Sequence, residues 1–149
     1  MKFSLEHRVI RKILTKIPVW YNAFDEMLSQ FSTSHMPTTH IMGLQPEPFE
    51  KIRSEKKTIE LRLFDEKRKA IQLGDIIEFQ KQPEERETIR TEVMALLRYK
   101  TFSELFDDFP IEAFGGTDKA SLLEGIHKFY APEQEQKETV LGIKIKLLA

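Results

Sequence analysis

Hydrophobic side chains recur with two different periods along this chain, and the change of period divides the sequence into two parts. Over residues 4–17, and again over residues 20–31, apolar residues fall at the three- and four-residue spacing of amphipathic helices. Beyond residue 39, short segments alternate between apolar and polar positions, which is typical of half-buried strands. We therefore predict an N-terminal helical extension over residues 1–38 and a mixed α+β domain over residues 39–149.

Within the second part, glycine, proline and charged residues separate the predicted elements. Strands are predicted at residues 40–44, 58–63, 76–80, 88–100 and 141–147. Helices are predicted at residues 48–53, 101–109, 118–130 and 132–137, and a charged loop at residues 65–69. This mixture of short strands and short helices favours an α+β fold.

Two of these segments have well-defined faces. The strand at residues 88–100 is predicted to place five side chains on one face, namely Ile89, Val93, Ala95, Leu97 and Tyr99. The helix at residues 118–130 is predicted to bury Leu122, Leu123, Ile126 and Phe129. Because the strand is long, we expect the sheet to bend around a small barrel.

Candidate functional side chains are densest at residues 54–62. The second half of this stretch alternates, so its apolar positions face a core and its polar positions face the opposite side. The polar candidates are Lys56, Lys57, Thr58, Glu60 and Arg62. A lysine beside a carboxylate can serve in binding or catalysis, whereas a Glu-x-Arg pair on a half-exposed strand contributes little. Because Lys57 precedes the strand, we expect its loss to cost about 0.5 kcal/mol or less of stability.

Composition limits these readings. The chain has 149 residues, within the range of one domain, and no cysteine, so disulfides and thiolate chemistry are excluded. It shows no apolar run near the ~20 residues of a membrane span and no signal-peptide core, so we expect a cytoplasmic protein that does not enter a membrane. The net charge of −1 argues against a strongly basic nucleic-acid binder. Residues 51–69 nevertheless carry eight basic and four acidic side chains, which could collect phosphates or form an ordinary solvated surface.

The same stretch resembles the signature of the ASCH family, the activating-signal-cointegrator homology domains of the PUA-like superfamily of small β-barrels. The family pattern is Gly-x-Lys-x-x-Glu-x-Arg, and Lys57, Glu60 and Arg62 match it. Glu55 stands in the place of the glycine, which indicates either a changed turn or one that never needed glycine. Similar segments follow in the family's order at residues 40–44, 48–54, 73–79, 99–106 and 140–143, so the resemblance covers about residues 40–148.

The resemblance implies a PUA-like barrel with a cleft that binds RNA, a nucleotide or a nucleoside. The residues expected at the ligand are Lys56, Lys57, Thr58, Glu60, Arg62 and Tyr99. In this interpretation the two lysines contact phosphate, while the glutamate and the arginine contact the polar edge of a base. Aromatic side chains suited to stacking on a base are Tyr99, Phe102 and Tyr130.

Two other functions stay open. Some small relatives hydrolyse an acyl group from a modified cytidine with the signature lysine, a threonine three residues on and a distant carboxylate. Lys57 matches that lysine, but Glu60 occupies the threonine position; as an enzyme, the chain would use these two residues in catalysis. The third hypothesis is a protein-interaction module that uses the N-terminal helices. The sequence leaves the oligomeric state open.

Other motifs predict no second site. The four histidines are scattered without metal-ligand spacing, and the chain has neither a Walker-type loop nor a dinucleotide fingerprint, so we expect no metal and no cofactor. The segment Gly115-Gly116-Thr117-Asp118 could offer backbone amides to an anion. A simple helix start is favoured, because Asp118 is a good helix cap and its charge would repel an anion.

Overall fold

The part of the chain that the computed structural model describes, residues 35–149, is built on one mixed five-stranded sheet. The strands are β1 (Thr39–Leu44), β2 (Ile59–Leu63), β3 (Ile76–Lys81), β4 (Thr88–Tyr99) and β5 (Val140–Leu147). Their order across the sheet is β1-β3-β4-β5-β2; β1 runs parallel to β3, and the other neighbouring pairs are antiparallel. The helices predicted at residues 4–17 and 20–31, with the interaction role assigned to them, lie outside the described residues.

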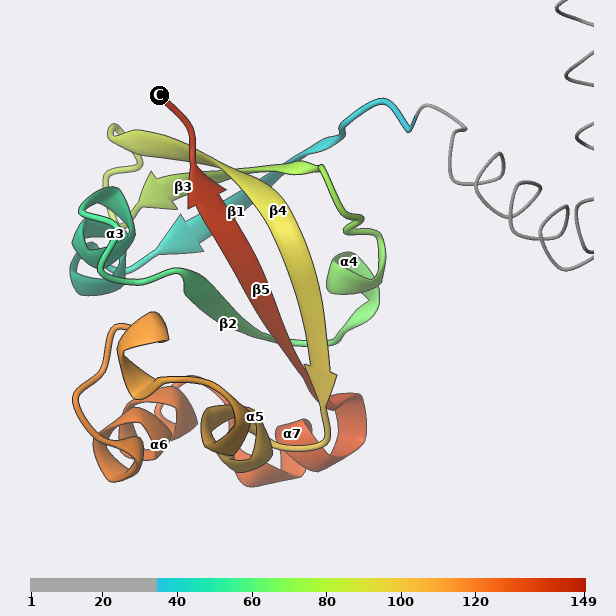
Figure 1. The fold of residues 1–149 in the computed structure, drawn as a ribbon, viewed down its shortest axis with the longest axis vertical. Helices are drawn as coiled ribbons and strands as arrows, with labels where there is room; N and C mark the ends of the chain where they lie inside the picture. The colour runs from blue at the N-terminus through green and yellow to red at the C-terminus, as the bar shows by residue number, and fades with distance from the viewer. Residues whose placement is uncertain (1–34) are drawn as a thin grey trace, which may run out of the picture. The chain divides into compact units, whose positions relative to one another are not determined.

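The sheet curls into a half barrel, with the long strand β4 crossing it from one end to the other (Figure 1). Its edge strands, β1 and β2, are not hydrogen-bonded to each other within the described residues. The prediction of a curved, barrel-like sheet in an α+β fold is therefore confirmed, with an open seam between β1 and β2 in place of full closure.

Five short α-helices and one 3-10 turn, η1 (Ile111–Ala113), accompany the sheet in residues 35–149. The α-helices are α3 (Pro46–Arg53), α4 (Glu66–Lys69), α5 (Phe102–Asp108), α6 (Lys119–His127) and α7 (Pro132–Glu138). Helices α5, α6 and α7 gather at one end of the sheet, while α3 lies near the start of β2 (Figure 1). The charged segment predicted as a loop contains α4, because the Asp65 side chain accepts a hydrogen bond from the Arg68 amide and caps one helical turn. No helix among these residues has the length and hydropathy needed to cross a lipid bilayer.

Two hydrophobic clusters share the sheet between them. The first packs β1, β3, β5 and α3, and includes Phe49, Ile77 and Phe79. The second packs β2 against α5 and α6, and includes Leu61 and Phe102. Strand β5 contributes to both clusters, whereas the apolar side chains of β2 pack in the second cluster alone.

Strand β4 contributes to both clusters because it contains a bulge between Val93 and Ala95. Val93 and Leu96 pack in the first cluster, whereas Leu97 and Tyr99 pack in the second. The single face predicted for this strand is therefore wrong beyond residue 93. An extra residue in a strand reverses the alternation that follows it.

Candidate functional site

The turn between α3 and β2 fixes the position of Lys57. Helix α3 ends at Arg53, and Glu55 then adopts a left-handed backbone conformation with φ of 59°. The Glu55 amide donates to the Ile52 carbonyl, and the Lys57 amide donates to the Lys51 carbonyl, both at 3.0 Å. Residues in this conformation after a helix are usually glycine, because a side chain makes it costly. The chain thus keeps a turn that favours glycine, although a glutamate occupies it.

Lys57, Glu60 and Arg62 form a buried ion cluster. Glu60 is 3% exposed, Lys57 is 9% exposed, and the Arg62 side chain is 13% exposed. The Lys57 Nζ atom lies 2.8 Å from Glu60 Oε2, and Arg62 Nε donates to Glu60 Oε1 at 3.1 Å. Ile59 and Leu61 are buried on the other side of β2, as the alternation predicts. Because the polar side is buried as well, β2 is not the half-exposed strand of the alternative interpretation.

Charge governs the protonation of this cluster. Burial acts to raise the pKa of the Glu60 carboxyl, but the neighbouring Lys57 and Arg62 outweigh it and hold the pKa below its ordinary value of 4.5. Burial acts to lower the pKa of the Arg62 guanidinium, but Glu60 and the Tyr130 hydroxyl hold this pKa above its ordinary value. The site therefore presents an ionised carboxylate between two cations at neutral pH.

One oxygen of Glu60 keeps unused hydrogen-bonding capacity. The Oε2 atom is buried and lies 2.8 Å from Lys57 Nζ, and it has no second donor among the described residues. An ionised carboxylate oxygen can accept two hydrogen bonds. Buried polar atoms with unmet capacity are uncommon and often mark a functional position.

Arg62 joins the two edges of the sheet. Its Nη2 atom donates to the Gly43 carbonyl at 2.9 Å, across the open seam between β2 and β1. Strand β1 is an edge strand that pairs only with β3 among the described strands, so Arg62 supplies a donor from the opposite edge. Because an unpaired backbone carbonyl in a buried place is costly, the arginine stabilises the seam. It also positions the Glu60 carboxylate through its Nε atom.

Two adjoining cavities open beside the cluster. The smaller, of about 200 Å³, has Lys57, Glu60 and Arg62 in its wall together with Tyr130. The larger cavity measures about 400 Å³. The residues that line both are Pro48, Lys57, Leu61, Ile126 and Phe129. The Lys57 side chain therefore lies where the two cavities meet.

Two consecutive aromatic residues contribute to the cavity walls. The prediction that Phe129 is buried on a helix continuing to Tyr130 is wrong, because α6 ends at His127. Phe129 lies beyond the helix, is 63% exposed and lines both cavities. Tyr130 stacks on the buried Phe102, with ring centroids 6.0 Å apart and an interplanar angle of 19°. An exposed ring beside an anchored one is a surface on which a planar ligand can stack.

The remaining predicted site residues lie apart from these cavities. Lys56 is exposed and lines neither of them. Thr58 lines a separate cavity of about 200 Å³ beside the end of β5. Tyr99 donates its hydroxyl hydrogen to Asp108 at 2.6 Å and packs edge-on against Phe109. The structure thus brings Lys57, Glu60 and Arg62 together, as the signature predicts, and places the other three elsewhere.

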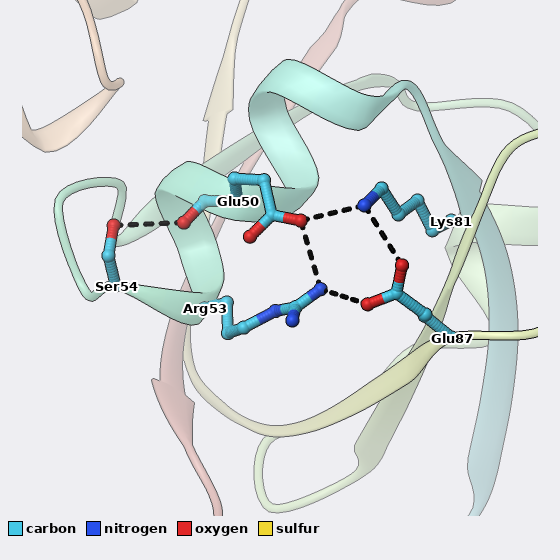
Figure 2. A network of polar contacts seen from close by, with 5 residues as sticks. All are labelled: Glu50, Arg53, Ser54, Lys81 and Glu87. Carbon is cyan, nitrogen blue, oxygen red and sulfur yellow. Dashed lines mark hydrogen bonds and ion pairs between the residues drawn. The ribbon is translucent and has the colours of Figure 1, made fainter.

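A ring of four charges holds α3 in place (Figure 2). Glu50 and Arg53 project from α3, Lys81 ends β3, and Glu87 precedes β4. Lys81 contacts Glu50 at 2.8 Å and Glu87 at 3.0 Å, and Arg53 contacts the same two carboxylates at 2.9 and 2.5 Å. Single exposed pairs contribute little, but a closed network fixes geometry better than one pair does. Through this ring, the helix that supplies Pro48 to both cavities is tied to the sheet.

The other polar motifs have structural roles. Asp118 accepts hydrogen bonds from the Ser121 amide and hydroxyl, both at 2.8 Å, as expected of a cap for α6. The Gly115 and Gly116 amides donate to backbone carbonyls and are not free for an anion. Over residues 35–149, no group of three or more His, Asp or Glu side chains is arranged to hold a metal ion.

Comparison with known proteins agrees with this architecture. A family model described as the ASCH domain matches residues 42–149. The solved structure of the hypothetical protein PH0355 is 34% identical, with a TM-score of 0.67, and the match covers 74% of this chain and 100% of that one. Protein PF0455 from Pyrococcus furiosus is also 34% identical, with a TM-score of 0.60 and coverage of 74% and 98%.

A more distant structure shares the fold alone. The ASCH protein from Zymomonas mobilis is 14% identical, with a TM-score of 0.53, and the match covers 73% of this chain and 67% of that one. No curated protein matches the chain. Since the family model spans most of the described residues and two structures share a third of their sequence with it, this chain belongs to the ASCH domain family.

Proposed function

We propose that this ASCH domain binds RNA, or a nucleotide or nucleoside, and holds a base in the smaller cavity. The ASCH family is linked to RNA binding. The observation that carries the proposal is the ionised, almost fully buried Glu60 carboxylate, which lies with its partners Lys57 and Arg62 in the wall of that cavity. A ligand in this cavity can form charge-assisted hydrogen bonds with these groups, which are stronger than hydrogen bonds between neutral groups.

The polar groups of the cavity suit the edge of a base. Glu60 accepts a hydrogen bond from an amino or ring N–H group, and Lys57 beside it donates to a carbonyl or ring nitrogen. Tyr130 supplies a ring and Phe129 an exposed face for stacking, which is the usual way that proteins hold an unpaired base. A volume of about 200 Å³ is below the ~300–1,000 Å³ of drug-sized sites, and this favours a single base.

We also propose a role for the open seam. We place this half barrel in the PUA-like group. In this proposal the ligand enters through the seam between β1 and β2, and the hydrogen bond from Arg62 to Gly43 fixes the distance between the two strands. We also propose that the domain begins near residue 39 and that residues 1–38 form a separate extension. Lys56, which is exposed close to Lys57, contributes a phosphate contact in this proposal.

Two adjacent lysines provide a matched test. Lys57→Met removes the buried ammonium and Lys56→Met the exposed one, and affinities for nucleosides and short single-stranded RNA are measured by titration calorimetry at low and high salt. A charged hydrogen bond of about 1.5–3 kcal/mol predicts that Lys57→Met weakens binding by about tenfold or more at both salt concentrations. Lys56→Met should weaken it about threefold or less, and only at low salt. Equal effects of the two changes, or no effect of Lys57→Met, would contradict the proposal.

We rank binding above hydrolysis. Removal of an acyl group from a modified cytidine, as in the relatives with a signature lysine and threonine, needs a hydroxyl group beside the lysine. Among the residues that line the smaller cavity, only Tyr130 has one, since Glu60 takes the place of the threonine. Incubation of the protein with an N4-acylated cytidine decides between the two: turnover that is lost in Lys57→Met would favour the enzyme.

A further inference from the structure

The larger cavity has no assigned role, although it adjoins the proposed base site. Its floor is formed by apolar side chains, among them Phe114, Leu122 and Ile126, and the exposed ring of Phe129 lies at its boundary with the smaller cavity. Lys57 and Lys51 are the basic residues in its wall, and Glu47, which pairs with Lys51 at 2.6 Å, is the acidic one. An apolar floor beside an exposed ring suits a second planar group. Each ammonium group is paired with a carboxylate, and its remaining N–H groups can donate to an anion that joins the second group to the first.

Three glycines line the larger cavity, and two of them are explained by the fold. Gly115 has φ of 77°, a left-handed conformation that favours glycine. A side chain at Gly116 would begin 2.6 Å from Leu122, which is too close. Neither reason applies to Gly125: its φ lies outside the left-handed region, and an added Cβ atom would meet nothing within 4 Å.

Gly125 therefore stands in α6 without a backbone or packing requirement. Glycine inside a helix is destabilising relative to alanine, so its presence there is a disadvantage for the fold. Gly125 lies in the wall of the larger cavity, and the absence of a side chain at this position leaves the cavity open. A longer side chain at residue 125 would fill that space.

We propose that the larger cavity is a second base subsite, kept open by Gly125, and that the ligand of this domain is a single strand of at least two nucleotides. The first base lies in the smaller cavity, the neighbouring base lies on the apolar floor against Phe129, and the phosphodiester between them passes Lys57. This inference rests on the proposed function, since it extends the base site to its neighbour. It predicts that the domain prefers a polynucleotide to a free nucleoside.

The test compares probes that differ only in the second base. The full-length chain is titrated with nucleoside 3′- and 5′-monophosphates, with dinucleoside monophosphates, and with the same dinucleotides made abasic at either position. Stacking of one base on an aromatic ring predicts that dinucleotides bind about tenfold or more tightly than monophosphates, and that one of the abasic forms loses this gain.

Two substitutions of Gly125 then test whether the higher affinity of the dinucleotides arises in the larger cavity. Gly125→Leu should remove the advantage of the dinucleotide and leave monophosphate affinity within about twofold, because Gly125 does not line the smaller cavity. Gly125→Ala should keep most of the advantage, since it adds one methyl group. Both variants should melt at or above the temperature of the wild type, because each removes a glycine from a helix.

The outcomes separate the two proposals. If monophosphates and dinucleotides bind with equal affinity, the second subsite is refuted while the base site stands. If Gly125→Leu retains the full dinucleotide advantage, the second base lies elsewhere and the inference is also wrong. If no probe binds at all, both proposals fail together.

Discussion

Replacing Glu60 by glutamine should destabilise the domain more than replacing Lys57 by methionine, although each change removes one charge from the same ion pair. The two oxygens of Glu60 face donors on both sides, Arg62 Nε at 3.1 Å and Lys57 Nζ at 2.8 Å. A glutamine has one oxygen and one NH₂ group, so its NH₂ must face one of the two cations. The change also leaves two buried cations without a counter-ion, for which we expect a cost of about 3–5 kcal/mol.

The methionine substitution leaves a better-compensated site. Glu60 keeps its contact with Arg62, and the methionine keeps most of the packing of the lysine stem. The loss is one charged hydrogen bond, of about 1.5–3 kcal/mol. This exceeds the roughly 0.5 kcal/mol expected from the sequence, because Lys57 is 9% exposed and not a surface residue at a strand entrance.

The assay is urea unfolding of the full-length chain at neutral pH, for each single variant and for the double variant. In the double variant one unpaired cation is absent, so its cost should fall short of the sum of the single costs by about 0.5–3 kcal/mol. Lys56→Met is the matched control and should change stability by less than about 0.5 kcal/mol. A cost for Glu60→Gln below that for Lys57→Met, or strict additivity, would refute the reasoning.

Three further outcomes follow from the same geometry. Glu55→Gly should raise the unfolding free energy by about 0.5–1 kcal/mol in urea titrations. Glycine adopts the left-handed conformation without the steric cost of a side chain, and this gain exceeds the cost of the conformational entropy that glycine adds to the unfolded chain. The pKa of Glu60 is lower in the folded state than its ordinary 4.5, so its contribution is present above pH 4.5 and is lost as the pH falls through the lowered value. Below pH 4.5, the free energy of unfolding should therefore fall less steeply with decreasing pH in Glu60→Gln than in the wild type. Arg62→Lys should cost about 1.5–3 kcal/mol in thermal unfolding, since an ammonium cannot span Glu60 and Gly43 as the guanidinium does.

Local pattern determined much of this fold. Alternation identified β2 and β5, and the buried Ile59, Leu61 and Ile143 lie where that period puts them. Capping chemistry located the start of α6, since Asp118 bonds the Ser121 amide. These features depend on neighbours within a few residues, so the order of side chains contains the information needed to predict them.

Other features depended on residues far apart in the chain. The burial of Glu60 arises because both faces of β2 are covered. The partner of Arg62 across the seam is the Gly43 carbonyl, 19 residues away in the sequence. The sequence has a glycine at residue 125 within a helical pattern, but its proposed role depends on its place in the wall of a cavity, which only the folded chain defines. The sequence predicts that Tyr99 contacts the ligand, but in the folded chain its hydroxyl group donates to Asp108.

The sequence by itself therefore determined the family signature, most of the elements and the apolar face of the central strand. The tertiary structure alone decided that Lys57, Glu60 and Arg62 are buried together beside two adjoining cavities, and that the bulge in β4 divides one strand between two cores. The reason is physical: periodicity tells which side of an element is apolar, whereas burial of a polar side depends on what packs against it from elsewhere in the chain.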